Sequence, residues 1–267
     1  MARTDLVDID WQGRVVRIEH QWLNAHMAEA PLFVFLHEGL GSVAMWREYP
    51  QQLCNALSVR GLVYSRPGYG QSTPRDADEH WQPNFMHVQA HEVLPALLKA
   101  LDVRKAPWLF GHSDGGSIAL LYAAHHATTG VVALAPHIRV EDVSVSSIAL
   151  AKETYENTDL RQRLARYHVD VDSAFWGWNR IWLAPEFRDW SIEQELSSIT
   201  CPVLAVQGIN DEYGTLAQVR DIQRLVPHTE LLELENCAHS PHRDQPQALT
   251  QACLTFFKAH PSPTAQP

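Results

Sequence analysis

A serine near the middle of the chain has the residue context of a catalytic nucleophile. Ser113 lies between Gly111 and Gly115, directly after the apolar run 107–110 and directly before a helix-forming segment. A sharp strand-to-helix turn of this kind strains the serine backbone and presents its hydroxyl above a sheet, and the glycines remove side chains that would clash there. We therefore predict that Ser113 is a nucleophile. The alternative is an ordinary glycine-rich turn.

Two later turns carry groups that could activate this serine. A serine hydroxyl is a weak nucleophile near neutral pH, and it needs an imidazole base held in the right tautomer by a carboxylate. Asp211 follows the apolar run 201–208, and His239 follows the last such run at 230–235. Because each comes early in the loop after its strand, we predict Asp211 as the acid and His239 as the base.

The same part of the chain contains rival residues for these roles. Glu212 and Asp221 are rivals for the acid, and His242 is a rival for the base but lies farther along its loop, toward the next helix. Asp114 is a rival nucleophile in principle, although the glycine frame centres on the serine and leaves Asp114 one place out of register. Spacing therefore ranks these residues second without excluding them.

Two backbone N–H groups are candidates for binding the oxyanion that such a reaction forms. The helix predicted after the serine turn directs its amino end at the site, which makes the N–H of Asp114 one donor. In the turn 37–42, Gly39 lets the backbone approach a substrate carbonyl closely, unless this is only a tight turn. Glu38 is an unusual neighbour for a negative charge. It either points away or selects a cationic substrate group.

The elements that must position these residues are short apolar runs alternating with helical patterns. The runs occupy residues 14–20, 32–36, 61–65, 107–110, 131–136, 201–208 and 230–235. A helical pattern extends over 85–101, and others follow the serine turn and close the chain. Such alternation predicts an α/β fold with a mostly parallel sheet and helices on both faces, in which ligands bind at the carboxyl ends of the strands.

One segment departs from this pattern. Residues 137–195 are helical, charged and aromatic-rich, and they contain no run typical of a buried strand. We therefore predict a core formed by residues 1–136 and 196–267, with 137–195 as an inserted helical cap. Trp176, Trp178 and Trp182 in the cap, and His137 at its start, are candidate substrate contacts. Packing of the cap onto the core explains them equally well.

Composition limits the partners of the chain. Its 21 Lys and Arg residues against 31 Asp and Glu give a formal charge of −10, which disfavours nucleic acids and anionic membranes as main partners. The expected ligand is a small molecule, and an aromatic one would suit the tryptophans. The sequence leaves open whether the chain forms a homo-oligomer. The four cysteines are scattered and the first residues do not read as a signal peptide, so a reduced, cytoplasmic setting is expected.

Metal binding is not expected from the sequence. His87 and His91 are spaced i, i+4 on one predicted helix face, which could in principle hold a metal ion. No acidic or cysteine partner pattern accompanies them. The prediction is therefore that the chain has no metal site.

Five turns resemble, in order, the marker turns of α/β-hydrolase enzymes with a helical cap. They occupy residues 36–42, 65–72, 111–116, 208–214 and 236–246. The first resembles the His-Gly-Gly-Pro-Gly turn of proline iminopeptidase-like members, with Glu38 and Leu40 departing from it. The third is similar to the serine turn of valacyclovir hydrolase-like and aromatic-degradation hydrolase-like members. The resemblance covers nearly the whole chain and implies a Ser-His-Asp triad that works without a metal or organic cofactor.

The expected reaction is hydrolysis of a small carboxylic ester, lactone or thioester through an acyl-enzyme. The same scaffold supports other reactions, so the fold does not decide the substrate. Within enzymes, the alternative is hydrolysis of a carbon–carbon bond in an aromatic ring-fission product. From other classes, a non-catalytic ligand receptor and a cofactor-free oxygen chemistry stay open.

Overall fold

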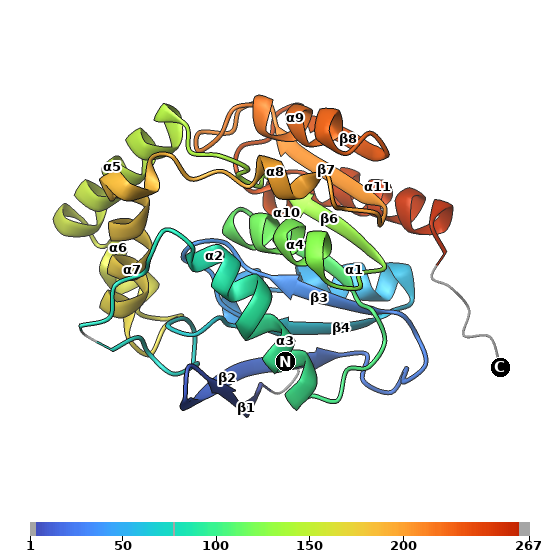
Figure 1. The fold of residues 1–267 in the computed structure, drawn as a ribbon, viewed down its shortest axis with the longest axis horizontal. Coiled ribbons are helices and arrows are strands. Elements are labelled where there is room, and N and C mark those ends of the chain that lie inside the picture. Colours follow the sequence, from blue (N-terminus) through green and yellow to red (C-terminus); the bar gives the residue numbers. More distant parts are fainter. Residues whose placement is uncertain (1–3, 77, 262–267) are drawn as a thin grey trace.

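An eight-stranded sheet runs through the centre of the protein (Figure 1). The computed structural model describes residues 4–76 and 78–261. The strands are β1 (Asp5–Trp11), β2 (Arg14–Leu23), β3 (Leu32–Leu36), β4 (Arg60–Tyr64), β5 (Trp108–His112), β6 (Gly130–Leu134), β7 (Val203–Gly208) and β8 (Thr229–Leu234). They lie in the order β1-β2-β4-β3-β5-β6-β7-β8, and all neighbours from β4 to β8 pair in parallel. The carboxyl ends of these parallel strands therefore meet at one edge.

Helices cover both faces of the sheet, as the alternation of elements predicts. One face carries α2 (Phe85–Val88), α3 (Leu94–Ala100), α4 (Asp114–His125) and α9 (Ala217–Leu225), and the other carries α1 (Tyr49–Leu57) and α11 (Pro246–Ala259). Alternate residues of β3 serve the two cores: Val34 and Leu36 pack in the first, Phe33 and Phe35 in the second. Burial on both faces explains why the central strands read as continuous apolar runs.

Two elements differ from the sequence predictions. β1, which pairs antiparallel with β2, was not predicted; it is an edge strand in which only Ile9 and Trp11 are buried. The helix expected over 85–101 is interrupted by a π-helical turn, η2 (Gln89–Val93). Pro95 has no N–H to donate to the carbonyl four residues earlier, and the helix widens just before it.

The chain between β6 and β7 is helical in the structure. It forms α5 (Asp142–Asn157), α6 (Leu160–Leu164), α7 (Val171–Leu183), the 3₁₀ turn η3 (Pro185–Phe187) and α8 (Glu193–Leu196). We refer to residues 142–196 as the α5–α8 segment. Figure 1 shows α5, α6 and α7 beyond one end of the sheet. Within the described residues, no helix is both long and apolar enough to cross a membrane.

Candidate active site

The turn between β5 and α4 holds Ser113 in a strained conformation. Its φ of 53° and ψ of −121° are rarely adopted by residues with a side chain, and such strain is concentrated at functional sites. A Cβ atom at Gly111 would overlap the carbonyl of Gly115, and one at Gly115 would overlap the carbonyl of Leu36. The two glycines therefore allow a tight turn that a larger residue at either position would disrupt.

The structure brings Ser113, His239 and Asp211 into one hydrogen-bonded chain. Nε2 of His239 lies 2.9 Å from Oγ of Ser113, and Nδ1 lies 2.9 and 3.0 Å from the two carboxylate oxygens of Asp211. Because a carboxylate only accepts, Nδ1 carries the proton and Nε2 is free to accept the serine proton. Burial lowers the pKa of His239, but the hydrogen bond and charge of Asp211 outweigh it and raise that pKa above its ordinary value.

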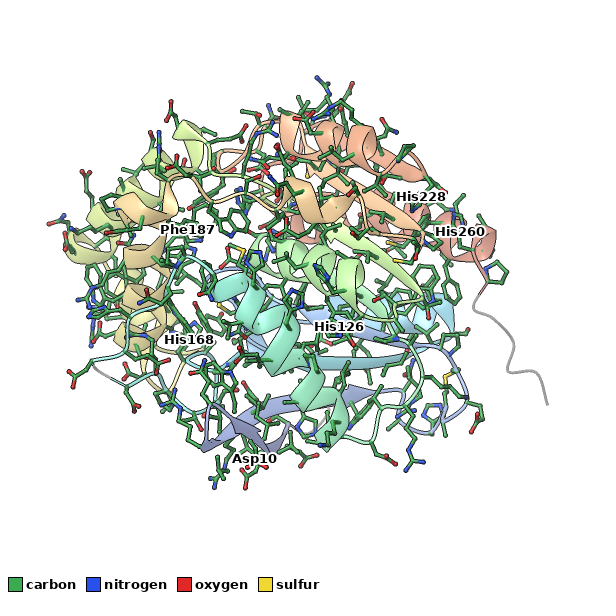
Figure 2. The ribbon with its side chains drawn as sticks, viewed as in Figure 1. Asp10, His126, His168, Phe187, His228 and His260 are labelled. Atoms are coloured by element: carbon green, nitrogen blue, oxygen red, sulfur yellow. The ribbon has the colours of Figure 1, made fainter. Side chains whose placement is uncertain are left out.

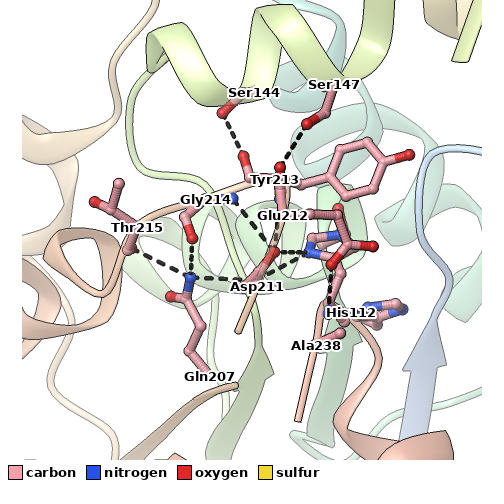
Figure 3. Close-up of polar contacts among 12 residues, drawn as sticks. His112, Ser144, Ser147, Gln207, Asp211, Glu212, Tyr213, Gly214, Thr215 and Ala238 are labelled. Atoms are coloured by element: carbon pink, nitrogen blue, oxygen red, sulfur yellow. Dashed lines mark hydrogen bonds and ion pairs between the residues drawn. The ribbon is translucent and has the colours of Figure 1, made fainter. Parts of the chain in front are cut away.

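Asp211 is held by the loop in which it lies (Figure 3). Its Oδ1 accepts the backbone N–H of Tyr213 at 2.8 Å, and its Oδ2 accepts from Nε2 of Gln207 at 3.2 Å. Burial would raise the pKa of Asp211, but the hydrogen bond and charge of His239 keep it below its ordinary value. The carboxylate is therefore ionised and oriented toward the imidazole.

Two serines of α5 fasten the loop that contains Asp211. Oγ of Ser144 donates to the carbonyl of Tyr213 at 2.6 Å, and Oγ of Ser147 donates to the carbonyl of Glu212 at 2.5 Å (Figure 3). These bonds join the α5–α8 segment to the acid loop. Neither serine was singled out from the sequence.

The rival residues have other partners. Oε2 of Glu212 accepts the backbone N–H of His239 at 3.2 Å, so it contacts the histidine main chain rather than its ring. Asp221 pairs with Arg139 and Arg224. The ring of His242 is buried, with its centre 4.9 Å from that of Trp46.

The predicted oxyanion donors lie on neighbouring elements at this edge of the sheet. Asp114 is the first residue of α4, so its N–H belongs to the amino end of that helix, where negative charge is favoured. Gly39 lies in the turn after β3, the strand that pairs with β5. The structure therefore places both donor residues at strand ends next to the serine turn.

Arg66, in the second of the five marker turns, is a further residue of this site that was not singled out from the sequence. It follows β4, its side chain is 1% exposed, and its Nη2 donates to the carbonyl of Glu38 at 2.9 Å. The same nitrogen lies 3.6 Å from Oδ2 of Asp114. One feature of the sequence could have indicated this role: Arg66 comes directly after the apolar run 61–65. A guanidinium buried there needs polar partners.

Comparison with known proteins decides the family. A model of the alpha/beta hydrolase family matches residues 33–252. The chain belongs to the alpha/beta hydrolase family. This confirms the family and fold predicted from the marker turns, and it makes the protein an enzyme of the hydrolase class.

Relatives of this hydrolase differ in their reactions. An sn-1-specific diacylglycerol lipase of Mus musculus is 24% identical over 86% of this chain and 82% of its own length. A 2-succinyl-6-hydroxy-2,4-cyclohexadiene-1-carboxylate synthase of Yersinia pestis (strain Pestoides F) is 30% identical, but the match covers 48% of this chain and 44% of the synthase. The chain therefore spans less than half of that relative.

Two solved structures show the same fold. A thermophilic esterase from Thermogutta terrifontis has a TM-score of 0.74 with 17% identity, over 97% of this chain and all of the esterase chain. The enol-lactonase from Burkholderia xenovorans LB400 has a TM-score of 0.73 with 21% identity, over 94% of this chain and 99% of its own. At these identities the likeness concerns the fold alone.

Two tryptophans of α7 reach the site of the hydrolase. A Cβ atom at Gly39 would clash with the indole of Trp178, so this ring lies directly on the turn 37–42 that carries the predicted donor Gly39, which we refer to as the oxyanion turn. Nε1 of Trp182 donates to Oδ1 of Asp114 at 3.2 Å. Trp176 is not brought to the serine; it lines a surface cavity of about 310 Å³ with Trp81 and other residues.

His137 lies between Trp182 of α7 and the candidate base. Its ring centre is 4.9 Å from that of Trp182 and 6.0 Å from that of His239. Burial and the nearby His239 lower its pKa to about 3. The His137 ring is therefore neutral at ordinary pH, and its buried Nδ1 has no hydrogen-bond partner among the described residues.

The side chain of Glu38 points to protein groups. Its Oε2 lies 3.6 Å from Nδ1 of His112 and its Oε1 lies 3.7 Å from Nη2 of Arg243, a residue of α10 (Pro241–Asp244). Burial would raise the pKa of Glu38, but His112 and Arg243 hold it well below its ordinary value. Of the two expectations for this residue, these contacts favour the one in which it points away from the substrate.

His168, labelled in Figure 2, joins the α5–α8 segment to two loops at the sheet edge and was not found from the sequence. Its Nδ1 accepts the backbone N–H of Gly70 at 3.0 Å, so its Nε2 carries the proton and donates to the carbonyl of Leu40 at 3.0 Å. The ring thus bridges the loop after β4 and the oxyanion turn. Nothing in the local sequence around His168 signals these distant partners.

The described residues contain no group of three or more His, Cys, Asp or Glu arranged to hold a metal ion. His87 instead faces Glu195, with Nε2 3.2 Å from Oε1. His91 faces His126, with Nδ1 3.2 Å from Nε2.

Proposed function

We propose that this hydrolase cleaves a small carboxylic ester, lactone or thioester, with Ser113 as nucleophile, His239 as base and Asp211 as the orienting acid. The observation that carries the proposal is the hydrogen-bonded chain from Ser113 Oγ through the His239 ring to Asp211, with the serine at a positive φ. An uninterrupted nucleophile, base and carboxylate in this geometry is the arrangement that activates a hydroxyl.

The proposed reaction proceeds in two stages. Oγ of Ser113 attacks the substrate carbonyl while its proton passes to Nε2 of His239, and the N–H groups of Gly39 and Asp114 bind the oxygen that becomes negative. His239 then returns the proton to the leaving alcohol or thiol, which leaves an acyl-serine. A water molecule then gives a proton to His239 and attacks the acyl-serine carbonyl, and the carboxylic acid is released when Ser113 regains its proton. Asp211 stays ionised throughout and stabilises the imidazolium.

The surroundings of Ser113 support an uncharged, flat or aromatic acyl group. The ring of Trp178 lies on Gly39, that of Trp182 lies on Asp114, and His137 is neutral. A dicarboxylate ring-fission product would require an unpaired cation in the same place, whereas the guanidinium of Arg66 is already engaged by Glu38 and Asp114, so these residues favour the ester over the carbon–carbon reaction. We further propose that residues 137–195 act as the cap that contributes these rings.

Wild-type protein tests this proposal directly. A fluorophosphonate is expected to label the protein at one serine, identified by peptide mass spectrometry as Ser113. A panel of p-nitrophenyl esters of rising acyl size, including benzoate, is expected to show turnover. A folded wild-type protein that is neither labelled nor active on any ester, lactone or thioester would contradict the proposal.

Replacement of Trp178 by alanine is expected to change acyl selectivity. The indole covers Gly39, so its removal opens space beside the acyl group, and one pocket change of this kind shifts relative kcat/KM by about 10- to 100-fold. The measurement is the ratio of kcat/KM for bulky and small esters.

Trp11→Ala is a matched control for this prediction. Trp178 is 7% exposed and Trp11 is 4% exposed, but Trp11 lies on the edge strand β1, where its Nε1 donates to Glu92. Both variants are expected to lose about 3–5 kcal/mol of stability through the cavity they create. Only Trp178→Ala should change the selectivity ratio, and an equal change in both variants would show that Trp178 has a packing role alone.

A further inference from the structure

The buried guanidinium of Arg66 reaches both residues that carry the proposed oxyanion donors. We propose that Arg66 is a positioning residue of the oxyanion hole, acting through the peptide between Glu38 and Gly39 and through the side chain of Asp114. This inference rests on the proposed function, in which the N–H groups of Gly39 and Asp114 bind the oxyanion. Arg66 is not placed in contact with the substrate.

The carbonyl of Glu38 accepts from three donors, one of which is the backbone N–H of Gly41 at 3.0 Å in the same turn. Nη2 of Arg66 donates to it at 2.9 Å, and Nδ1 of His37 lies 2.7 Å from the same oxygen. Nε2 of His37 accepts the backbone N–H of Arg66 at 3.0 Å, so the proton of this ring is on Nδ1. Burial and the charge of Arg66 lower the pKa of His37 well below its ordinary value, which keeps the ring in this neutral form.

Holding this carbonyl sets the direction of the Gly39 N–H. In a planar trans peptide the C=O and the following N–H point to opposite sides, so the Arg66 and His37 side chains, which help to fix the Glu38 oxygen, also aim the N–H of Gly39. A cationic donor on the oxygen also polarises the amide, and such coupling strengthens a neighbouring hydrogen bond by about 10–30%. Arg66 therefore affects both the aim and the donor strength of the Gly39 N–H.

The same guanidinium constrains the other donor residue. Nη2 of Arg66 lies 3.6 Å from Oδ2 of Asp114, whose Oδ1 accepts from Nε1 of Trp182. Both Arg66 and Asp114 are 1% exposed, so each needs the other as a charge partner. The guanidinium carbon also lies 4.8 Å from the ring centre of Tyr69, which limits its movement. Arg66 therefore links the β3 turn to the first residue of α4.

The experiment compares the double variant Asp114→Asn, Arg66→Met with the single variant Asp114→Asn. Asparagine removes the buried carboxylate that Arg66→Met alone would leave unpaired, and it keeps an oxygen for Trp182. Each protein is assayed on an ester and on the matching thionoester, whose sulfur is a poor hydrogen-bond acceptor. If the N–H of Gly39 is no longer directed at the oxyanion, hydrolysis of the ester should slow and hydrolysis of the thionoester should not. Arg66→Lys, which keeps a cation of shorter reach, tests for partial rescue.

Arg66→Met is expected to lower kcat for the ester by about 10- to 100-fold relative to Asp114→Asn, because one misaligned donor costs part of what removal of a donor costs. KM and thionoester turnover are expected to change by less than about threefold. Arg66→Lys should fall between the two proteins. Retained ester turnover, or an equal loss on ester and thionoester in a folded variant, would overturn the inference.

These outcomes are separable from failure of the proposed function. If wild-type protein hydrolyses no ester, the proposed function fails before Arg66 is tested. If wild-type protein is active and loses activity in Ser113→Ala, but the ratio of ester to thionoester turnover does not depend on Arg66, only the inference about Arg66 fails.

Discussion

Alanine at position 113 is expected to lower kcat for the best ester by about 10⁶-fold, the size of loss seen when a triad nucleophile is removed. The Ser113 hydroxyl is the only group in the proposed mechanism that forms a bond to the substrate, and its 2.9 Å contact with His239 would be lost. Substrate binding should survive because the pocket is otherwise unchanged. The measurement is steady-state turnover, with binding of a non-hydrolysable analogue followed by calorimetry.

Ser113→Gly provides the control for folding. Glycine adopts a φ of 53° and ψ of −121° without strain, so this variant should be as inactive as alanine and more stable than wild type by about 1 kcal/mol. Turnover in either variant above about 1% of wild type, after a purity check by active-site labelling, would show that another residue is the nucleophile.

Asp211→Asn is expected to lower kcat by about 10⁴-fold, because an amide can present its N–H₂ group to Nδ1 and stabilise the wrong tautomer of His239. Asp211 also raises the pKa of His239, so the variant should lose its remaining activity at a lower pH than wild type does when the medium is acidified. The measurement is the pH profile of kcat/KM.

Glu212→Gln is the matched control for Asp211→Asn. Glu212 is the neighbouring acid in the same loop, but its carboxylate accepts the backbone N–H of His239, which a glutamine oxygen can also accept. We expect its activity to stay within about fivefold of wild type, since one exposed hydrogen bond of this kind is worth about 1 kcal/mol. If Glu212→Gln shows the larger loss, the acid has been misassigned.

The sequence was sufficient to predict the fold and the strand ends at which the candidate site lies. Ser113, Asp211 and His239 follow buried parallel strands, and such strands end at the same edge, so their order along the chain indicates proximity. The structure brings these three residues together. β1 was missed because an edge strand alternates acidic and apolar residues and buries only two of them.

The contacts that tune the site could not be found in this way. Arg66 meets Glu38, and His168 meets Leu40, across loops distant in sequence, and their partners depend on how those loops pack. No local pattern encodes such contacts. Helical spacing, by contrast, could have separated the three candidate tryptophans of residues 137–195. Trp178 and Trp182 are four residues apart and so share a helix face, whereas Trp176 lies about 200° around the helix from Trp178.

The hydroxyls of Ser144 and Ser147 have a consequence for protein engineering. They donate to the carbonyls of Tyr213 and Glu212, so α5 is part of the support on which the acid of the site rests. A chimera that exchanged the α5–α8 segment for that of another hydrolase would remove both donors. The carbonyls of Glu212 and Tyr213 would then need other hydrogen-bond donors. The helix that replaces α5 should therefore carry hydroxyl side chains at the positions of Ser144 and Ser147. In the proposed mechanism, an exchange of this segment to change substrate preference must also bring the groups that support the Asp211 carboxylate.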